Sequence, residues 1–529
     1  MDAMRRRLLK GGSVALGAAM LAPGAHAASG EAASFARTRS GRIAGARHDG
    51  VHVFKGIRYG ADTAPRRFRP ALREAAWRGV REALEYGAAA PQNGEDRPGS
   101  EDCLFLNVWT PGLRDGGRRP VLVYIHGGGY NNGSGSAPLY DGTRLCRRGD
   151  VVVVTLNHRL NAFGYLYLGE LPGGGAFADS GNVGQLDLVD ALQWVREHAA
   201  EFGGNAGNVT VFGQSGGGAK IATLMAMPAA RGLFHRAWTM SGQQVTAAGP
   251  RAATQRARLL LDELGVGDDL AELAALPAQR ILEAIRIRDP SRVEDSSLYF
   301  GPVMDSRSLP RHPFHPDAPP QSASVPMVIG NTRDETRAFL GKDAANFALT
   351  WETLPAKLRE QQYSDLSPGI VVAEYRRLYP DYTPSEVFFA ATTAGRSWRG
   401  AVLECEARAR QGDNTWAYQL DWPSPLEGGR LRALHTLDIA LVFDNIAQPG
   451  SLAGNSPRAQ RIADRMSASL LAFARTGDPN HPGIPQWAPY SLGNRETMVF
   501  DDATRLEDDP RGGERRLYER VPFVQRGTF

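Results

Sequence analysis

The chain has 529 residues, of which 42% are apolar and 22% are charged. This is an ordinary globular composition, and a chain of this length can bury a large core. The formal net charge is only +4, and no basic run with interleaved aromatic residues occurs, so nucleic-acid binding is not expected.

The first 27 residues have the pattern of an export signal. Arg5 and Arg6 precede two leucines and a lysine, a mildly apolar segment follows, and residues 25–27 read Ala-His-Ala, a small-residue cleavage site. Residues 1–27 are therefore predicted to be a twin-arginine-type signal peptide, and the mature protein to be periplasmic or secreted. The apolar segment is too short and too rich in Gly and Ala to span a membrane comfortably, so no stable membrane span is expected.

Three cysteines, Cys103, Cys146 and Cys405, are present. An odd number in an exported protein excludes a fully paired disulfide framework. No two of them have the spacing of zinc ligands, so no metal site is predicted.

Alternating strand and helix patterns fill the first half of the chain. Residues 38–60 read as two short strands around a turn, and residues 121–125 and 151–156 are continuous apolar runs, typical of strands covered on both faces. A helix is predicted soon after residue 181. This alternation predicts an α/β fold with a large, mostly parallel central sheet and helices on both faces.

A run of glycines ends the strand predicted at 121–125. His126 is followed by Gly127, Gly128 and Gly129. Consecutive glycines let backbone N–H groups face a ligand without obstruction by side chains, as a developing oxyanion requires. By residue type alone, His126 is also a candidate base.

The most informative stretch, residues 202–218, contains a G-x-S-x-G motif centred on Ser215. The apolar run 209–212 predicts a buried strand, and residues 219–225 are predicted to be helical. A tight turn between strand and helix requires glycine on either side of the serine and holds its hydroxyl where a base can reach it. A glycine-rich turn with a solvated serine is the alternative, which the flanking strand and helix disfavour.

Candidate acids and a candidate base follow later strands. Asp334 and Glu335 leave the end of the strand predicted at 326–330, the end at which chemistry gathers in open α/β sheets. The residues alone do not separate these two acids. His435 lies beyond the next predicted strand, at residues 416–420. This position fits the order serine, acid, histidine along the chain. The strand at 416–420 is also expected to be the last clear core strand.

The remaining segments are predicted to belong to one catalytic domain covering residues 35–529. Residues 250–300 and 341–410 are expected to form helical, cap-like insertions. Phe388, Phe389 and Trp398 either shape the substrate pocket or pack in a core. Ser241, at the end of a strand predicted at 237–241, either supports the site from behind or simply ends its strand.

Together these motifs resemble the signatures of type-B carboxylesterases, a family with the α/β-hydrolase fold that also contains the cholinesterases. Residues 202–218 and 101–108 carry the resemblance most clearly, and it extends from about residue 37 to the end. It implies a serine carboxylesterase that hydrolyses small-molecule esters through an acyl-enzyme, without metal or cofactor.

The resemblance also implies roles for individual residues. Ser215 is the nucleophile, His435 the base and Glu335, rather than Asp334, the acid, while His126 is a scaffold residue. The oxyanion hole is expected to be formed by the amides of Gly128, Gly129 and Gly216.

Several positions refine this interpretation. Most relatives carry Glu before the nucleophile and Ala after it, whereas this chain has Gln214 and Gly216. The glutamine removes a negative charge and should weaken any preference for cationic substrates. Asp438 stands where relatives often have Glu and is expected to support the catalytic groups from behind.

Two structural expectations follow from the same resemblance. Arg67 and Glu101 are predicted to form a buried ion pair. No cysteine precedes Cys103 at the spacing of the cholinesterase loop, and the tryptophan of that loop is missing. A cholinesterase specificity is therefore not expected, and Cys103 is predicted to be a free, buried thiol.

Two alternatives come from other functional classes. A catalytically silent α/β-hydrolase could act in binding or adhesion, because a fold alone does not define a function. A lipase would need a mobile apolar lid. The intact candidate triad argues against the first and the mildly hydrophilic composition against the second. Aryl esters, carbamates and esters of tertiary alcohols are open as substrates.

Overall fold

The computed structural model describes residues 34–94, 99–289 and 297–525. The predicted signal peptide lies outside these residues. Within them, thirteen strands form one sheet in the order β1-β2-β3-β5-β7-β6-β8-β9-β10-β11-β12-β13, with β4 beside β2. The strands are β1 (Ser34–Arg37), β2 (Arg42–His48), β3 (Val51–Arg58), β4 (Val80–Glu82), β5 (Phe105–Thr110), β6 (Arg119–Ile125), β7 (Val152–Leu156), β8 (Gly204–Gln214), β9 (Arg236–Met240), β10 (Met327–Thr332), β11 (Thr415–Leu420), β12 (Glu496–Phe500) and β13 (Arg505–Asp508).

Seven neighbouring strands of the sheet are mutually parallel, in the order β7, β6, β8, β9, β10, β11 and β12. Antiparallel strands flank them on both sides. Helices connect the parallel strands and cover the sheet. They are α1 (Thr143–Gly149), α2 (Asn161–Tyr165), α3 (Val183–His198), α4 (Gly216–Leu224), α5 (Pro250–Leu264), α6 (Leu270–Ala275), α7 (Ala278–Ala284), α8 (Arg337–Leu340), α9 (Leu354–Gln361), α10 (Pro368–Leu378), α11 (Pro384–Thr393), α12 (Arg399–Gln411), α13 (Leu437–Val442), α14 (Pro457–Thr476) and α15 (Gly512–Tyr518).

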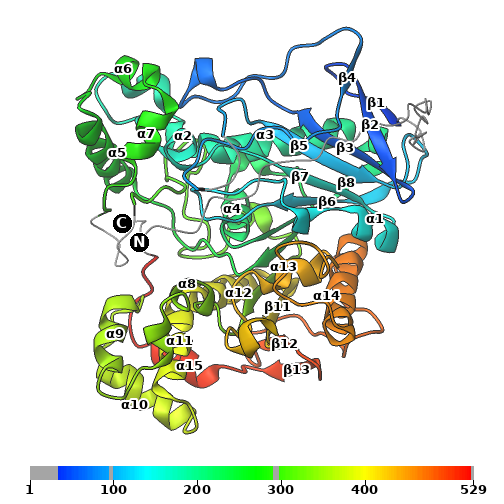
Figure 1. Cartoon of the computed structure of the whole chain (residues 1–529). Coiled ribbons are helices and arrows are strands. Elements are labelled where there is room, and N and C mark those ends of the chain that lie inside the picture. Colours follow the sequence, from blue (N-terminus) through cyan, green and yellow to red (C-terminus); the bar gives the residue numbers. More distant parts are fainter. Residues whose placement is uncertain (1–33, 95–98, 290–296, 526–529) are drawn as a thin grey trace, which may run out of the picture.

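The core lies on both faces of the sheet because successive side chains of a strand point in opposite directions. In β6, Val121, Val123 and Ile125 pack toward α3 and α4, and Leu122 and Tyr124 pack toward α1, α13 and α14. Figure 1 shows α3 above the sheet and α13 and α14 below it. Covering both faces explains the continuous apolar runs of the central strands.

The sheet continues beyond β11, so the expectation that β11 is the last core strand was wrong. β12 pairs with β11 in parallel, and β13 closes this edge in an antiparallel arrangement. β12 is short, and β13 is partly exposed and carries three charged residues in four. Such segments lack the long apolar run by which the earlier strands can be found.

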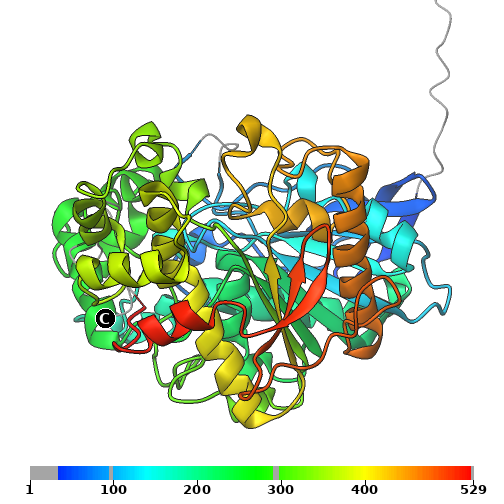
Figure 2. The ribbon, with the colours of Figure 1, turned by 90° about the horizontal axis from the view of Figure 1, so that it is seen from below.

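Two helical groups extend from the sheet, at the left in Figure 1 and Figure 2. One contains α5, α6 and α7, which pack against α2. The other contains α9, α10 and α11 with the C-terminal α15. Phe388 and Phe389 are fully buried within this second group, so they belong to its core. None of the described helices is long and apolar enough to cross a membrane.

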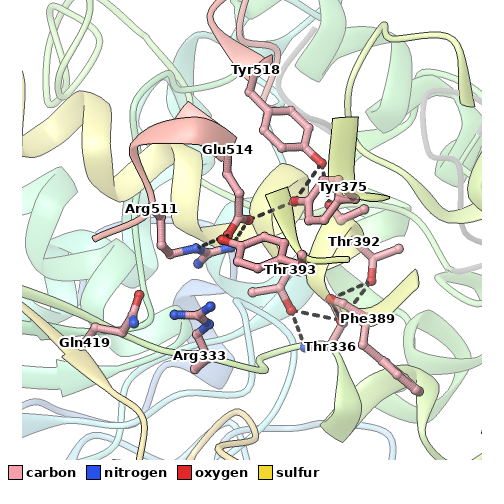
Figure 3. A network of polar contacts seen from close by, with 12 residues as sticks. Arg333, Thr336, Tyr375, Phe389, Thr392, Thr393, Gln419, Arg511, Glu514 and Tyr518 are labelled. Carbon is pink, nitrogen blue, oxygen red and sulfur yellow. Dashed lines mark hydrogen bonds and ion pairs between the residues drawn. The ribbon is translucent and has the colours of Figure 1, made fainter. Parts of the chain in front are cut away.

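A buried polar network fastens α15 to the second helical group (Figure 3). Arg511 donates to Glu514 with Nε 3.0 Å from the carboxylate, and both side chains are about 1% exposed. The hydroxyls of Tyr375 and Tyr379 each donate to the same carboxylate at 2.7 Å. The Arg511 guanidinium also lies 4.1 Å from the Trp398 ring centre. Trp398 therefore supports the C-terminal helix.

Removing the acid of this network should destabilise the protein strongly. Glu514→Leu leaves the Arg511 charge buried without its partner, which typically costs about 3–5 kcal/mol. The matched control is Glu507→Leu, because Glu507 forms an exposed pair with Arg505 and such pairs contribute about 0–1 kcal/mol. Urea unfolding measures the free energy of unfolding of both variants. An equal loss of this free energy in the two variants would contradict the assigned role of the network.

The expectations for the Arg67–Glu101 pair and for Cys103 are confirmed. Arg67 Nε donates to Glu101 at 2.8 Å, and the two side chains are 8% and 10% exposed. The three cysteines, all in the described part of the chain, are free and buried. Burial raises the pKa of Cys103 well above its usual value, so this thiol is inert.

Candidate active site

Ser215 occupies the turn between β8 and α4, at the carboxyl end of the sheet. Its backbone has φ 57° and ψ −127°, a conformation that non-glycine residues adopt only under strain. The turn is so tight that a Cβ on Gly217 would lie 2.0 Å from the carbonyl oxygen of Ile125. The amide of Ser215 donates to Met240 O at 2.7 Å. The sequence motif thus produces the strained turn expected of an exposed nucleophile.

Glu335 and His435 form a buried pair beside this turn. The Glu335 carboxylate is hydrogen bonded to His435 Nδ1. Its other oxygen accepts bonds from the Thr332 amide at 2.9 Å and from Asn331 Nδ2 at 3.3 Å. Asp334 instead faces Arg337, with Oδ1 3.3 Å from Nε. The structure therefore separates the two acids that the sequence left equivalent.

The environment of Glu335 favours its ionised form. Burial raises its pKa, but the opposing effects of the neighbouring imidazole and of hydrogen bonds from His435 and the Thr332 amide outweigh it, so the pKa of Glu335 lies below its usual value. With a carboxylate at Nδ1, the proton of the neutral imidazole is held on that nitrogen and Nε2 is left as the basic one. Ser241, at the end of β9, lines the same cavity as Ser215.

Ser215 and His435 line one cavity of about 290 Å³. Within the described residues no direct hydrogen bond joins the two side chains. Such bonds are commonly long or misaligned until substrate binds. Helical and C-terminal segments supply much of the wall, including residues that no sequence motif indicated: Gln243, Gln244, Tyr299, Phe300, Tyr363 and Phe523.

The glycine loop 126–130 stands opposite Ser215. Gly128 and Gly129 have φ of 85° and 59°, and Gly129 and Gly216 both line the cavity with the serine. His126 is fully buried under the loop and stacks on His158 with 4.8 Å between ring centres. Burial and the charge of Lys220 lower the pKa of His126 to about 3. The histidine is thus a neutral scaffold group.

Two further predicted residues lie against the triad candidates. The amide nitrogen of Gln214 is 3.2 Å from His435 Nε2 and 3.4 Å from Nδ1, so a neutral group contacts the imidazole. Asp438 accepts a 2.8 Å bond from the Tyr418 hydroxyl. Burial and the charge of Glu335 raise the pKa of Asp438 to about 7, which reduces the negative charge behind the pair at neutral pH.

In the described part of the chain, no group of three His, Cys, Asp or Glu side chains could hold a metal ion. The site brings together a serine, an imidazole and a carboxylate at the carboxyl end of a parallel sheet. This combination of fold and site defines an α/β-hydrolase.

Comparisons with known proteins identify the family. The family model described as "Carboxylesterase family" matches residues 32–516. Para-nitrobenzyl esterase of Bacillus subtilis is 34% identical over 492 residues, covering 90% of this chain and 97% of that protein. Phenmedipham hydrolase of Pseudarthrobacter oxydans is 32% identical, covering 88% and 95%. The crystal structure of carboxylesterase EST55 from Geobacillus stearothermophilus is 38% identical, with a TM-score of 0.81 over 92% of this chain and 99% of that one.

The chain belongs to the carboxylesterase family and is a carboxylic-ester hydrolase. The alternative of a silent binding protein is not favoured by these relatives. The roles of individual site residues stay predictions that the geometry supports.

Proposed function

We propose that Ser215, His435 and Glu335 act as a catalytic triad. The observation that carries this proposal is the buried Glu335–His435 bond on the wall of the cavity that Ser215 also lines. His435 Nε2 takes the hydroxyl proton as Ser215 Oγ attacks the ester carbonyl. Glu335 holds the imidazole in orientation and stabilises its charged form.

The tetrahedral intermediate then collapses to an acyl-enzyme. His435 returns the proton to the leaving alcohol, and a water activated by the same imidazole releases the acid. The amides of Gly128, Gly129 and Gly216 are the proposed donors to the oxyanion. One such donor contributes about 3–4 kcal/mol to transition-state stabilisation.

The cavity favours esters with an aromatic alcohol group and no positive charge, and Arg396 adds a cationic side chain to its wall. No Asp or Glu is among the described residues that line it, and the residue before the nucleophile is the neutral Gln214. The wall carries several aromatic rings, among them Tyr299, Phe300 and Tyr363. Two relatives bear the names para-nitrobenzyl esterase and phenmedipham hydrolase, which is consistent with this class.

One set of esters tests both the mechanism and the preference. Butyrate esters of p-nitrophenol, benzyl alcohol and ethanol are hydrolysed in the presence of methanol, and butyric acid and methyl butyrate are quantified. A common acyl-enzyme predicts the same product ratio for every ester. The aromatic wall predicts a kcat/KM about tenfold higher for the benzyl than for the ethyl ester. Product ratios that vary with the leaving group would contradict a shared intermediate.

We also propose that the enzyme is exported. The support is the twin-arginine pattern at Arg5 and Arg6 and the Ala-His-Ala sequence at residues 25–27. N-terminal sequencing of the protein from the periplasm or the medium should begin at Ala28. Recovery of the intact N-terminus in the cytoplasm alone would contradict export.

A further inference from the structure

Lys220 is a buried cation that the mechanism above does not use. It lies on α4, one turn after Gly216, and its side chain is fully buried. Its Nζ donates to Gly129 O at 2.8 Å and to His126 O at 3.2 Å, and it lies 5.4 Å from the Tyr130 ring centre. The ammonium therefore contacts both ends of the glycine loop 126–130 from behind.

Gly216 makes this contact possible. A Cβ on Gly216 would lie 2.0 Å from Gly129 O and 2.5 Å from the carbonyl carbon. Because Gly216 has no side chain, the Gly129 peptide packs directly on the start of α4, and its carbonyl reaches Lys220. A side chain at residue 216 would move the loop away from both the helix and the ammonium.

The loop needs such a restraint. Between the two bonded carbonyls lie Gly127, Gly128 and Gly129, and glycine loses more conformational freedom on ordering than any other residue. An oxyanion hole stabilises charge only when its donors are already oriented before the reaction. Two bonds from one rigidly buried side chain would fix the orientation of these peptides.

We propose that Lys220 is a positioning residue for the oxyanion loop, holding the amides of Gly128 and Gly129 toward Ser215 through the carbonyls of His126 and Gly129. This inference rests on the proposed function. The positive charge behind the loop also favours the negative charge that develops in front of it. Lys220 contributes without touching the substrate.

The charge of Lys220 changes near neutral pH. Burial lowers its pKa to about 7, and no carboxylate in the described ranges is close enough to raise that pKa again. The titratable groups that face it are neutral there. Burial, with the Lys220 charge, lowers the pKa of His126 to about 3 and that of His158 well below its usual value, and burial raises the pKa of Tyr130. The protonated form should hold the loop better, so its contribution to kcat is lost as the pH rises through about 7.

The test compares wild type with Lys220→Met, which keeps the length and removes the charge. We expect kcat to fall about 10–100-fold with KM within about twofold, because only transition-state stabilisation is lost. The affinity for a trifluoromethyl ketone analogue of the substrate should fall by the same factor. The decline of wild-type kcat above pH 7 should disappear. Lys357→Met, on the distant α9, is the control and should change none of these values.

Stability separates positioning from a purely structural role. Lys220→Met removes the cost of a buried charge but also leaves the carbonyls of His126 and Gly129 without their donor, so the melting temperature should change little. A variant with unchanged kcat, analogue affinity and pH profile would overturn the proposal, as would one whose activity falls only in proportion to lost stability. Failure of Ser215 as nucleophile would appear separately, as activity retained in Ser215→Ala.

Discussion

Ser215→Ala should lower kcat for a p-nitrophenyl ester by about 10⁶-fold. The hydroxyl is the proposed nucleophile, and the strained turn that presents it has no other group able to form an acyl-enzyme. Steady-state hydrolysis by purified variants measures the loss, which assay background is expected to truncate.

Ser397→Ala is the matched control for this variant. Ser397 lines the same cavity but lies on the segment between α11 and α12. Its loss should change kcat by less than about tenfold, because it removes only a wall contact. Equal activity of Ser215→Ala and wild type would mean that another residue performs the attack.

Glu335→Gln should lower kcat by about 10⁴-fold with little change in the geometry of the site. A carboxylate at His435 Nδ1 keeps the proton on that nitrogen and stabilises the imidazolium, whereas an amide can donate to Nδ1 and favour the unproductive tautomer. The loss should appear in kcat more than in KM, because it acts on the proton-transfer step. Steady-state kinetics at the pH optimum measures both parameters.

Asp334→Asn tests whether the correct acid has been chosen. Asp334 is the sequence neighbour of Glu335 but contacts Arg337 rather than the imidazole. Its substitution should change kcat by only a fewfold, because its carboxylate contacts Arg337 and not the imidazole. A large loss in Asp334→Asn together with a small one in Glu335→Gln would reverse the assignment.

The sequence predicted the parts of the site that follow from local rules. The turn at Ser215 is encoded by its own glycines and by the strand before it, so its position could be found within a few residues. The order of serine, acid and histidine follows from the parallel strands β8, β10 and β11. Choosing Glu335 over Asp334 needed the resemblance or the structure, because the direction of each carboxylate depends on the turn after Thr332.

Other parts depend on contacts between distant segments. The wall of the cavity includes Tyr363 and Phe523, which are separated from Ser215 by more than a hundred residues and carry no motif. Lys220 reads as an ordinary helical lysine until the loop 126–130 is seen against its ammonium. Phe388 and Phe389 were equally compatible with a pocket or a core, and only packing against α9 and α15 decided for the core.

Covalent labelling tests the central claim most directly. The mature protein is incubated with a p-nitrophenyl phosphonate, and the site of modification is mapped by peptide mass spectrometry. The account predicts one phosphonyl group per chain, on Ser215, with activity lost in parallel. Labelling at another residue, or full activity after Ser215 has been modified, would contradict the assignment of the nucleophile.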